Sequence, residues 1–130
     1  MTALYKSREL AEIATERLKV FSQPQRLMIL SLLLEREHTV SEIEEASGIG
    51  QPALSQQLAE LRRAGLVTSS RIAKQVSYRL AGDDVAFRVR SIEALFGDGT
   101  ITAALEALAV REPQPHPSRP IAAASFATIS

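Results

Sequence analysis

The chain contains no cysteine and has only two histidines among its 130 residues. Without cysteine it has no disulfide, no thiolate metal ligand and no cysteine nucleophile. No apolar run approaches the ~20 residues needed to span a bilayer, and charges stand where a signal peptide needs an apolar stretch. We therefore expect a cytoplasmic protein without a membrane partner, and the length is that of one domain.

An excess of charge of one sign is also lacking, because the formal net charge at pH 7 is zero. The charges are nevertheless segregated along the chain. Residues 51–80 carry five basic side chains and a single acidic one, Glu60, whereas residues 35–50 and 81–112 are acidic. A local basic segment is typical of a nucleic-acid contact, even in a protein whose net charge is zero.

Apolar residues at helical spacing predict an amphipathic helix over residues 7–21. Pro24 suits the first turn of a second helix, over about residues 24–35, which is apolar nearly all round and is therefore the expected centre of the core. A further helix, opened by Gly82-Asp83-Asp84, is expected to end before Gly97. Thr100 is expected to cap a last short helix.

The middle of the chain has the pattern of a helix-turn-helix. Thr39 and Glu42 have the spacing of a capping box, which predicts a short helix that ends at Gly48. A second helix is expected from Gln51 or Pro52 to Arg63. Two short helices joined by a glycine-containing turn define the motif.

Two extended runs, residues 67–72 and 75–80, flank Ala73-Lys74 and predict a β-hairpin. Its tip lacks the Asn-Gly signal of a two-residue turn, which leaves the turn type open. We expect residues 1–111 to form one DNA-binding and dimerisation domain. Residues 112–130 are proline-rich at first and are expected to form a flexible tail.

The second helix of the motif is the candidate recognition helix. Leu54, Leu58 and Leu61 fall on one narrow face, and the opposite face is polar, short-chained at its start and basic at its end. Such a face is also common on any solvated helix. In a major groove, however, glutamine can pair with adenine, and serine can donate to or accept from a base edge. The candidate DNA contacts of this helix are Gln51, Pro52, Ser55, Gln56, Ala59 and Arg63.

The hairpin directly follows this helix and carries Arg71, Lys74 and Arg79. A basic hairpin in that order can lie along the phosphates as a wing and add affinity without sequence information. We take Arg71, Lys74 and Tyr78 as candidate DNA contacts of the wing. For Tyr78, packing within the strand is an equally good interpretation.

Several of these segments resemble the ArsR family of winged-helix repressors over about residues 8–96. They are the run QPQRLMILSLL, the run VSEIEEASGIGQPALSQQLAELRRAGLV and the hairpin that ends in SYRL. The resemblance implies a mainly α winged helix-turn-helix with one β-hairpin wing, and a homodimer in which the first and last main helices pair. Two positions depart from the family: Gly50 stands where serine is usual, and Gln57 where histidine is usual.

The resemblance also locates the family's sensor sites, and this chain lacks their ligands. The usual thiol positions hold Thr39-Val40-Ser41, and Asp84 is followed by no histidine in its helix. His38 is expected to be a solvated loop residue and His116 a tail residue, so we expect no metal site and no cofactor. A small-molecule or protein inducer is the remaining kind of signal.

We therefore predict a homodimeric repressor that binds duplex DNA at a pseudo-palindromic operator. The alternative is a winged-helix module that binds another protein without specific DNA binding, for which an apolar or mixed hairpin would be expected. An enzyme is not expected. Glu42, Glu44 and Glu45 are read as the solvated face of a short helix, favoured near its N-terminus by the helix dipole.

Overall fold

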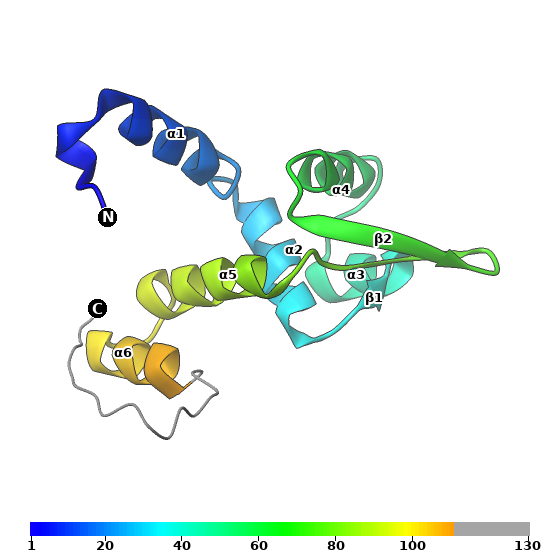
Figure 1. Ribbon diagram of the computed structural model, residues 1–130. Helices are drawn as coiled ribbons and strands as arrows, with labels where there is room; N and C mark the ends of the chain where they lie inside the picture. The colour runs from blue at the N-terminus through cyan, green and yellow to red at the C-terminus, as the bar shows by residue number, and fades with distance from the viewer. Residues whose placement is uncertain (111–130) are drawn as a thin grey trace, which may run out of the picture. The chain divides into compact units, whose positions relative to one another are not determined.

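The computed structural model describes residues 1–110 (Figure 1). The predicted tail, residues 112–130, lies outside the described residues. Within residues 1–110 no helix is both long enough and apolar enough to cross a bilayer. The elements, in chain order, are η1 (Leu4–Lys6), α1 (Arg8–Lys19), α2 (Pro24–Glu35), β1 (His38–Thr39), α3 (Val40–Ser47), α4 (Ala53–Arg63), β2 (Val67–Ile72), β3 (Gln75–Leu80), α5 (Asp83–Phe96) and α6 (Ile101–Val110).

Contacts divide the chain after Glu93 into two units. The second unit contains α6, and Thr100 caps this helix as expected, because its hydroxyl accepts from the Ala103 amide at 3.0 Å. The single domain predicted over residues 1–111 therefore remains a proposal. The first unit contains all the elements of the helix-turn-helix and the hairpin.

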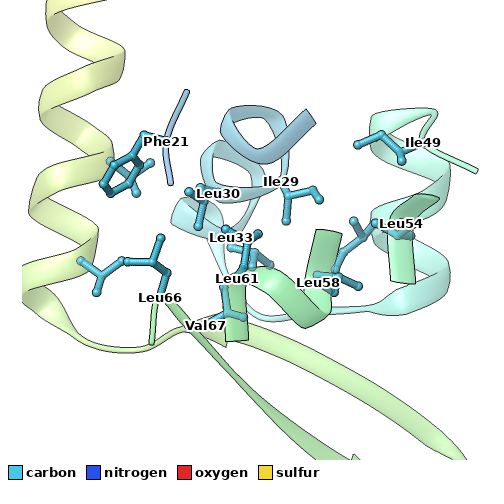
Figure 2. Close-up of a cluster of buried hydrophobic side chains, with 13 residues drawn as sticks. Phe21, Ile29, Leu30, Leu33, Ile49, Leu54, Leu58, Leu61, Leu66 and Val67 are labelled. Atoms are coloured by element: carbon cyan, nitrogen blue, oxygen red, sulfur yellow. The ribbon is translucent and has the colours of Figure 1, made fainter. Parts of the chain in front are cut away.

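The core of the first unit forms where α2 and α4 meet (Figure 2). Ile29, Leu30 and Leu33 are buried on α2, as the apolar pattern predicted, although Met28 on the same helix is 47% exposed. Leu54, Leu58 and Leu61 of α4 are each at most 2% exposed. Burying three leucines of one helix stabilises its position by several kcal/mol (about 1.5–3 kcal/mol each) and turns the opposite face to solvent.

The sheet has three antiparallel strands in the order β1-β3-β2. The predicted hairpin is confirmed with its bounds, since Ile72 pairs with Gln75 and leaves Ala73 and Lys74 as the tip. Ala73 has a φ of 59°, so this residue takes the left-handed conformation that glycine or asparagine usually supplies. The third strand, β1, was not predicted.

The expectation that His38 is a solvated loop residue is wrong. His38 pairs with Tyr78 in the sheet and is 4% exposed, and its ring Nδ1 lies 2.8 Å from the carbonyl oxygen of Arg36. The pairing of β1 with β3 draws His38 into the sheet, where its imidazole is buried. The bond to a carbonyl meets its need for a polar partner.

The capping box at the start of α3 is confirmed. The Glu42 amide donates to the Thr39 hydroxyl at 3.1 Å, and the Thr39 amide donates to Glu42 Oε1 at 2.9 Å. Gly48 ends the helix with a φ of 76°. The bond from the Thr39 amide, helped by Arg36, lowers the pKa of the Glu42 carboxyl below its ordinary value.

Because the pKa of Glu42 is lower in the folded state, its charged carboxylate stabilises the fold at pH values above the ordinary pKa of glutamate. This contribution is lost as the pH falls through the lowered folded value. We expect Glu42→Gln to be less stable than the wild type at neutral pH and to approach it in acid. Urea unfolding from neutral pH to about pH 3 measures this. Glu45→Gln on the same helix is the control, and an equal pH dependence of the two variants would contradict the assignment.

Candidate nucleic-acid interface

The exposed face of α4 is set by the burial of its leucines. Ser55, Gln56, Ala59 and Arg63 are all exposed on the side opposite Leu54, Leu58 and Leu61. The predicted division of this helix into a core face and a solvent face is therefore confirmed. A rigid helix that presents short polar side chains near its N-terminus is the shape that enters a major groove.

The start of α4 differs from the prediction. The helix begins at Ala53, so Gln51 and Pro52 lie in the preceding turn, joined by a cis peptide bond. Gln51 Oε1 accepts from the Ser55 amide at 3.1 Å and from the Ser55 hydroxyl at 2.6 Å. Gln51 thus satisfies a free amide of the first turn and engages the Ser55 hydroxyl. No hydrogen bond within residues 1–110 engages the Gln56 side chain, which leaves its amide available to a ligand.

Gln57 connects α4 to the start of α2. Its Oε1 accepts from Arg26 Nε at 2.8 Å, and its Nε2 donates to Gln23 Oε1 at 2.9 Å. Sequence reasoning noted Gln57 as a departure from the family but missed this role, together with Gln23 and Arg26. These contacts join residues more than 30 positions apart, so no local pattern signals them.

The hairpin places its basic side chains on both faces and at the tip. Paired residues share a face of an antiparallel sheet. Arg71 pairs with Val76, and Arg79 pairs with Thr68, which puts the two arginines on opposite faces. Lys74 is exposed at the tip, which extends away from the helices (Figure 1). Tyr78 is half-buried in the central strand and packs against the core, which favours the packing interpretation for this residue.

A polar cleft of about 330 Å³ lies between α2 and α4. It continues the exposed face of α4, because Gln56, Ala59 and Arg63 line it, as does Glu60. Gln23 and Arg26 line it from the α2 side. Arg63 Nη2 lies 2.5 Å from Glu60 Oε2, so these two exposed side chains form an ion pair.

A second, apolar hollow of about 280 Å³ lies between the end of α1 and the middle of α5. Leu18, Phe21, Phe87 and Ile92 line it. Leu18 is 62% exposed and Phe87 is 49% exposed, and α1 buries none of its residues. Contiguous exposed apolar side chains are typical of protein-contact surfaces, so this hollow is a candidate for one.

Within residues 1–110, no group of three or more histidine, cysteine, aspartate or glutamate side chains is arranged to hold a metal ion. The two charged side chains at the hollow are Arg17 and Arg88. The surface features of the described residues are a polar helix face, a basic hairpin and an apolar hollow.

A helix-turn-helix followed by a hairpin wing defines the winged helix-turn-helix class of regulators. Residues 23–69 match the family described as "Bacterial regulatory protein, arsR family". The chain is 46% identical to the biofilm growth-associated repressor of Xylella fastidiosa over 79 residues, which are 61% of this chain and 69% of that one. The chain belongs to the ArsR family of bacterial regulatory proteins.

Solved structures of regulators of this fold are also similar to the chain. The crystal structure of the transcriptional repressor BigR from Xylella fastidiosa matches with a TM-score of 0.64 and 37% identity, over 75% of this chain and all of that chain. The homodimeric winged helix-turn-helix DNA-binding domain Mb0332 from Mycobacterium bovis matches with a TM-score of 0.60 and 28% identity, over 73% of this chain and 86% of that one. Its solution structure is described as that of a possible ArsR-family transcriptional regulator.

Proposed function

We propose that the chain is a transcriptional repressor that binds duplex DNA as a homodimer at a pseudo-palindromic operator. The observation that carries the proposal is the exposed polar face of α4 beside a basic hairpin. Ser55 and Gln56 contact base edges, and Arg63 at the end of the helix meets the backbone. Repression is the activity named for the Xylella fastidiosa relatives.

Arg71 and Lys74 of the hairpin contact phosphates in this proposal. Both side chains are exposed, and neither belongs to an ion pair within residues 1–110. Their charges are therefore available to replace the counterions of a duplex. An exposed basic hairpin also favours DNA over a protein partner as the ligand of the wing.

The apolar surface of α1 and α5 is the proposed dimer interface. Leu10, Ile13 and Leu18 of α1 and Phe87 of α5 are each at least 39% exposed. The solved Mycobacterium bovis domain, of the same fold, is described as homodimeric. A two-fold dimer places two copies of α4 about one helical turn of DNA apart, roughly 34 Å, and thereby reads a pseudo-palindrome.

The experiment that tests the proposal is a gel shift with the region upstream of the chain's own gene. We expect a shifted band that survives an excess of scrambled duplex and disappears with unlabelled specific duplex. A protein that shifts both duplexes equally, or neither, would contradict sequence-specific repression.

Release from DNA is not expected to depend on thiol-binding metals, zinc or persulfide chemistry. The chain has no cysteine, and thiophilic ions and oxidants act on thiolates. Zinc also binds histidine and carboxylate groups, but residues 1–110 place no three or more such side chains together. We expect DNA affinity to be unchanged by zinc(II), cadmium(II), arsenite or an organic polysulfide in a fluorescence anisotropy titration. Stoichiometric release by any of them, reversed by a chelator or a reductant, would reveal a sensor site.

Without such chemistry, control rests on a small molecule at the dimer interface, on a protein antagonist, or on the concentration of the repressor itself. Each ligand would have to bind more tightly to a dimer geometry in which the two α4 helices are wrongly spaced.

A further inference from the structure

The polar cleft between α2 and α4 is continuous with the face of α4 that the proposed function assigns to DNA. Gln56, Ala59 and Arg63 belong to both. A duplex whose major groove receives α4 therefore brings its sugar-phosphate backbone to the mouth of the cleft, since phosphates border the groove on each side. The far wall of the cleft belongs to α2, which carries Arg26.

Arg26 is a half-buried cation held in a fixed position. Its Nε donates to Gln57 Oε1 at 2.8 Å, and its Nη1 donates to the carbonyl oxygen of Val20 at 3.4 Å. A guanidinium has five N–H donors, so these two bonds leave the others available. None of the ion pairs within residues 1–110 includes Arg26. A rigid guanidinium without a carboxylate partner suits an oxyanion that can accept several bonds, as a phosphate does.

Glu60 is the one acidic side chain that lines the cleft, and Arg63 pairs with it. The cleft therefore contains two guanidinium groups and one carboxylate, and the carboxylate lies against Arg63. Arg26 remains the cation that no acidic group of the cleft engages. The balance of charge in the cleft favours an anion.

We propose that this cleft binds one backbone phosphate of each operator half-site, with the Arg26 guanidinium as its ligand. Gln57 is then a positioning residue, which holds Arg26 against α4 and does not itself contact the phosphate. The inference rests on the proposed DNA-binding function. It adds a backbone contact from α2 to those of α4 and the hairpin.

The test is a salt titration of DNA affinity, followed by fluorescence anisotropy. The probes are a duplex selected by the wild type from a random pool and a scrambled duplex of the same length. Log K falls as log salt rises, and each lost phosphate contact reduces the magnitude of this slope by about 0.9. Each dimer loses two contacts, so we expect Arg26→Gln to reduce the magnitude of the slope by about 1.8 and to weaken both duplexes about 100-fold, which is about tenfold for each contact. Arg26→Lys should retain most of the slope.

Two matched variants separate this role from a structural one. Arg8→Gln removes an equally charged, exposed side chain of α1 and should leave the slope unchanged. Gln57→Ala keeps the charge of Arg26 and should weaken binding with little change of slope. If Arg26→Gln, Arg26→Lys and Gln57→Ala all weakened binding with an unchanged slope, Arg26 would only support α4 and the inference would fail.

A neutral methylphosphonate placed at successive backbone positions of the selected duplex locates the contact. At one position per half-site, the replacement should weaken the wild type but leave Arg26→Gln unaffected. Equal sensitivity of the two proteins at every position would overturn the proposed contact. A wild type that binds no duplex would instead contradict the function itself, which keeps the two failures distinct.

Discussion

A glutamate in place of Leu18 or Phe87 is expected to produce a folded monomer that binds the operator about 10²–10⁴-fold more weakly than the wild type. Leu18 is 62% exposed and Phe87 is 49% exposed in the single chain, and neither belongs to the buried core, so we expect the fold to tolerate the change. In the proposed dimer they are buried, and a buried unpaired carboxylate is costly. A monomer engages one half-site at a time and loses the gain from linked sites.

Analytical ultracentrifugation at micromolar concentration measures the oligomeric state, and fluorescence anisotropy measures the affinity for the operator. The wild type should sediment at about twice 14.2 kDa. Lys19→Glu is the control, because its carboxylate falls on the solvent side of α1, away from the apolar stripe. Dimers of unchanged stability in Leu18→Glu and Phe87→Glu would place the interface elsewhere.

Gln56→Ala and Ser55→Ala are expected to cost roughly 1–3 kcal/mol on the selected operator, about 5-fold to 150-fold in affinity, and to relax its sequence preference. The Gln56 side chain is exposed without an internal hydrogen bond, whereas the Ser55 hydroxyl already donates to Gln51. Base contact by Ser55 therefore uses the remaining acceptor capacity of its hydroxyl or displaces Gln51.

Lys74→Ala and Arg71→Ala form the contrasting pair. They should weaken binding to the selected and the scrambled duplex alike and lower the salt slope by about 0.9 for each lost phosphate contact, as expected for backbone contacts. Competition binding with single-base variants of the operator gives the comparison. If both pairs of variants lost affinity with the same dependence on sequence, α4 would not be the recognition helix.

Much of the fold could be predicted from local signals. Pro24 fixes the start of α2, the capping box fixes the start of α3, and two extended runs fix the hairpin to the residue. These signals are strong because each depends on residues a few positions apart, which interact without help from distant segments. The spacing of three leucines likewise gave the buried face of α4.

The rest depends on contacts between distant segments. A two-residue strand has no periodicity, so β1 exists only because β3 pairs with it, and that pairing buries His38. The same holds for the junction of Gln57 with Arg26 and Gln23, which packing of α2 on α4 creates. The role of Gln51 in capping α4 was missed because the helix starts two residues later than its earliest expected position.

The measurement that tests the central claim most directly is selection of duplexes from a random pool by the wild type, with the mass of the resulting complex determined by ultracentrifugation. We predict an inverted repeat with half-sites centred roughly 34 Å apart or a multiple of this distance, bound by two copies of the chain. A pool that remains random after repeated selection, or a complex with one chain on an unsymmetric site, would contradict the claim that a homodimer reads a pseudo-palindrome.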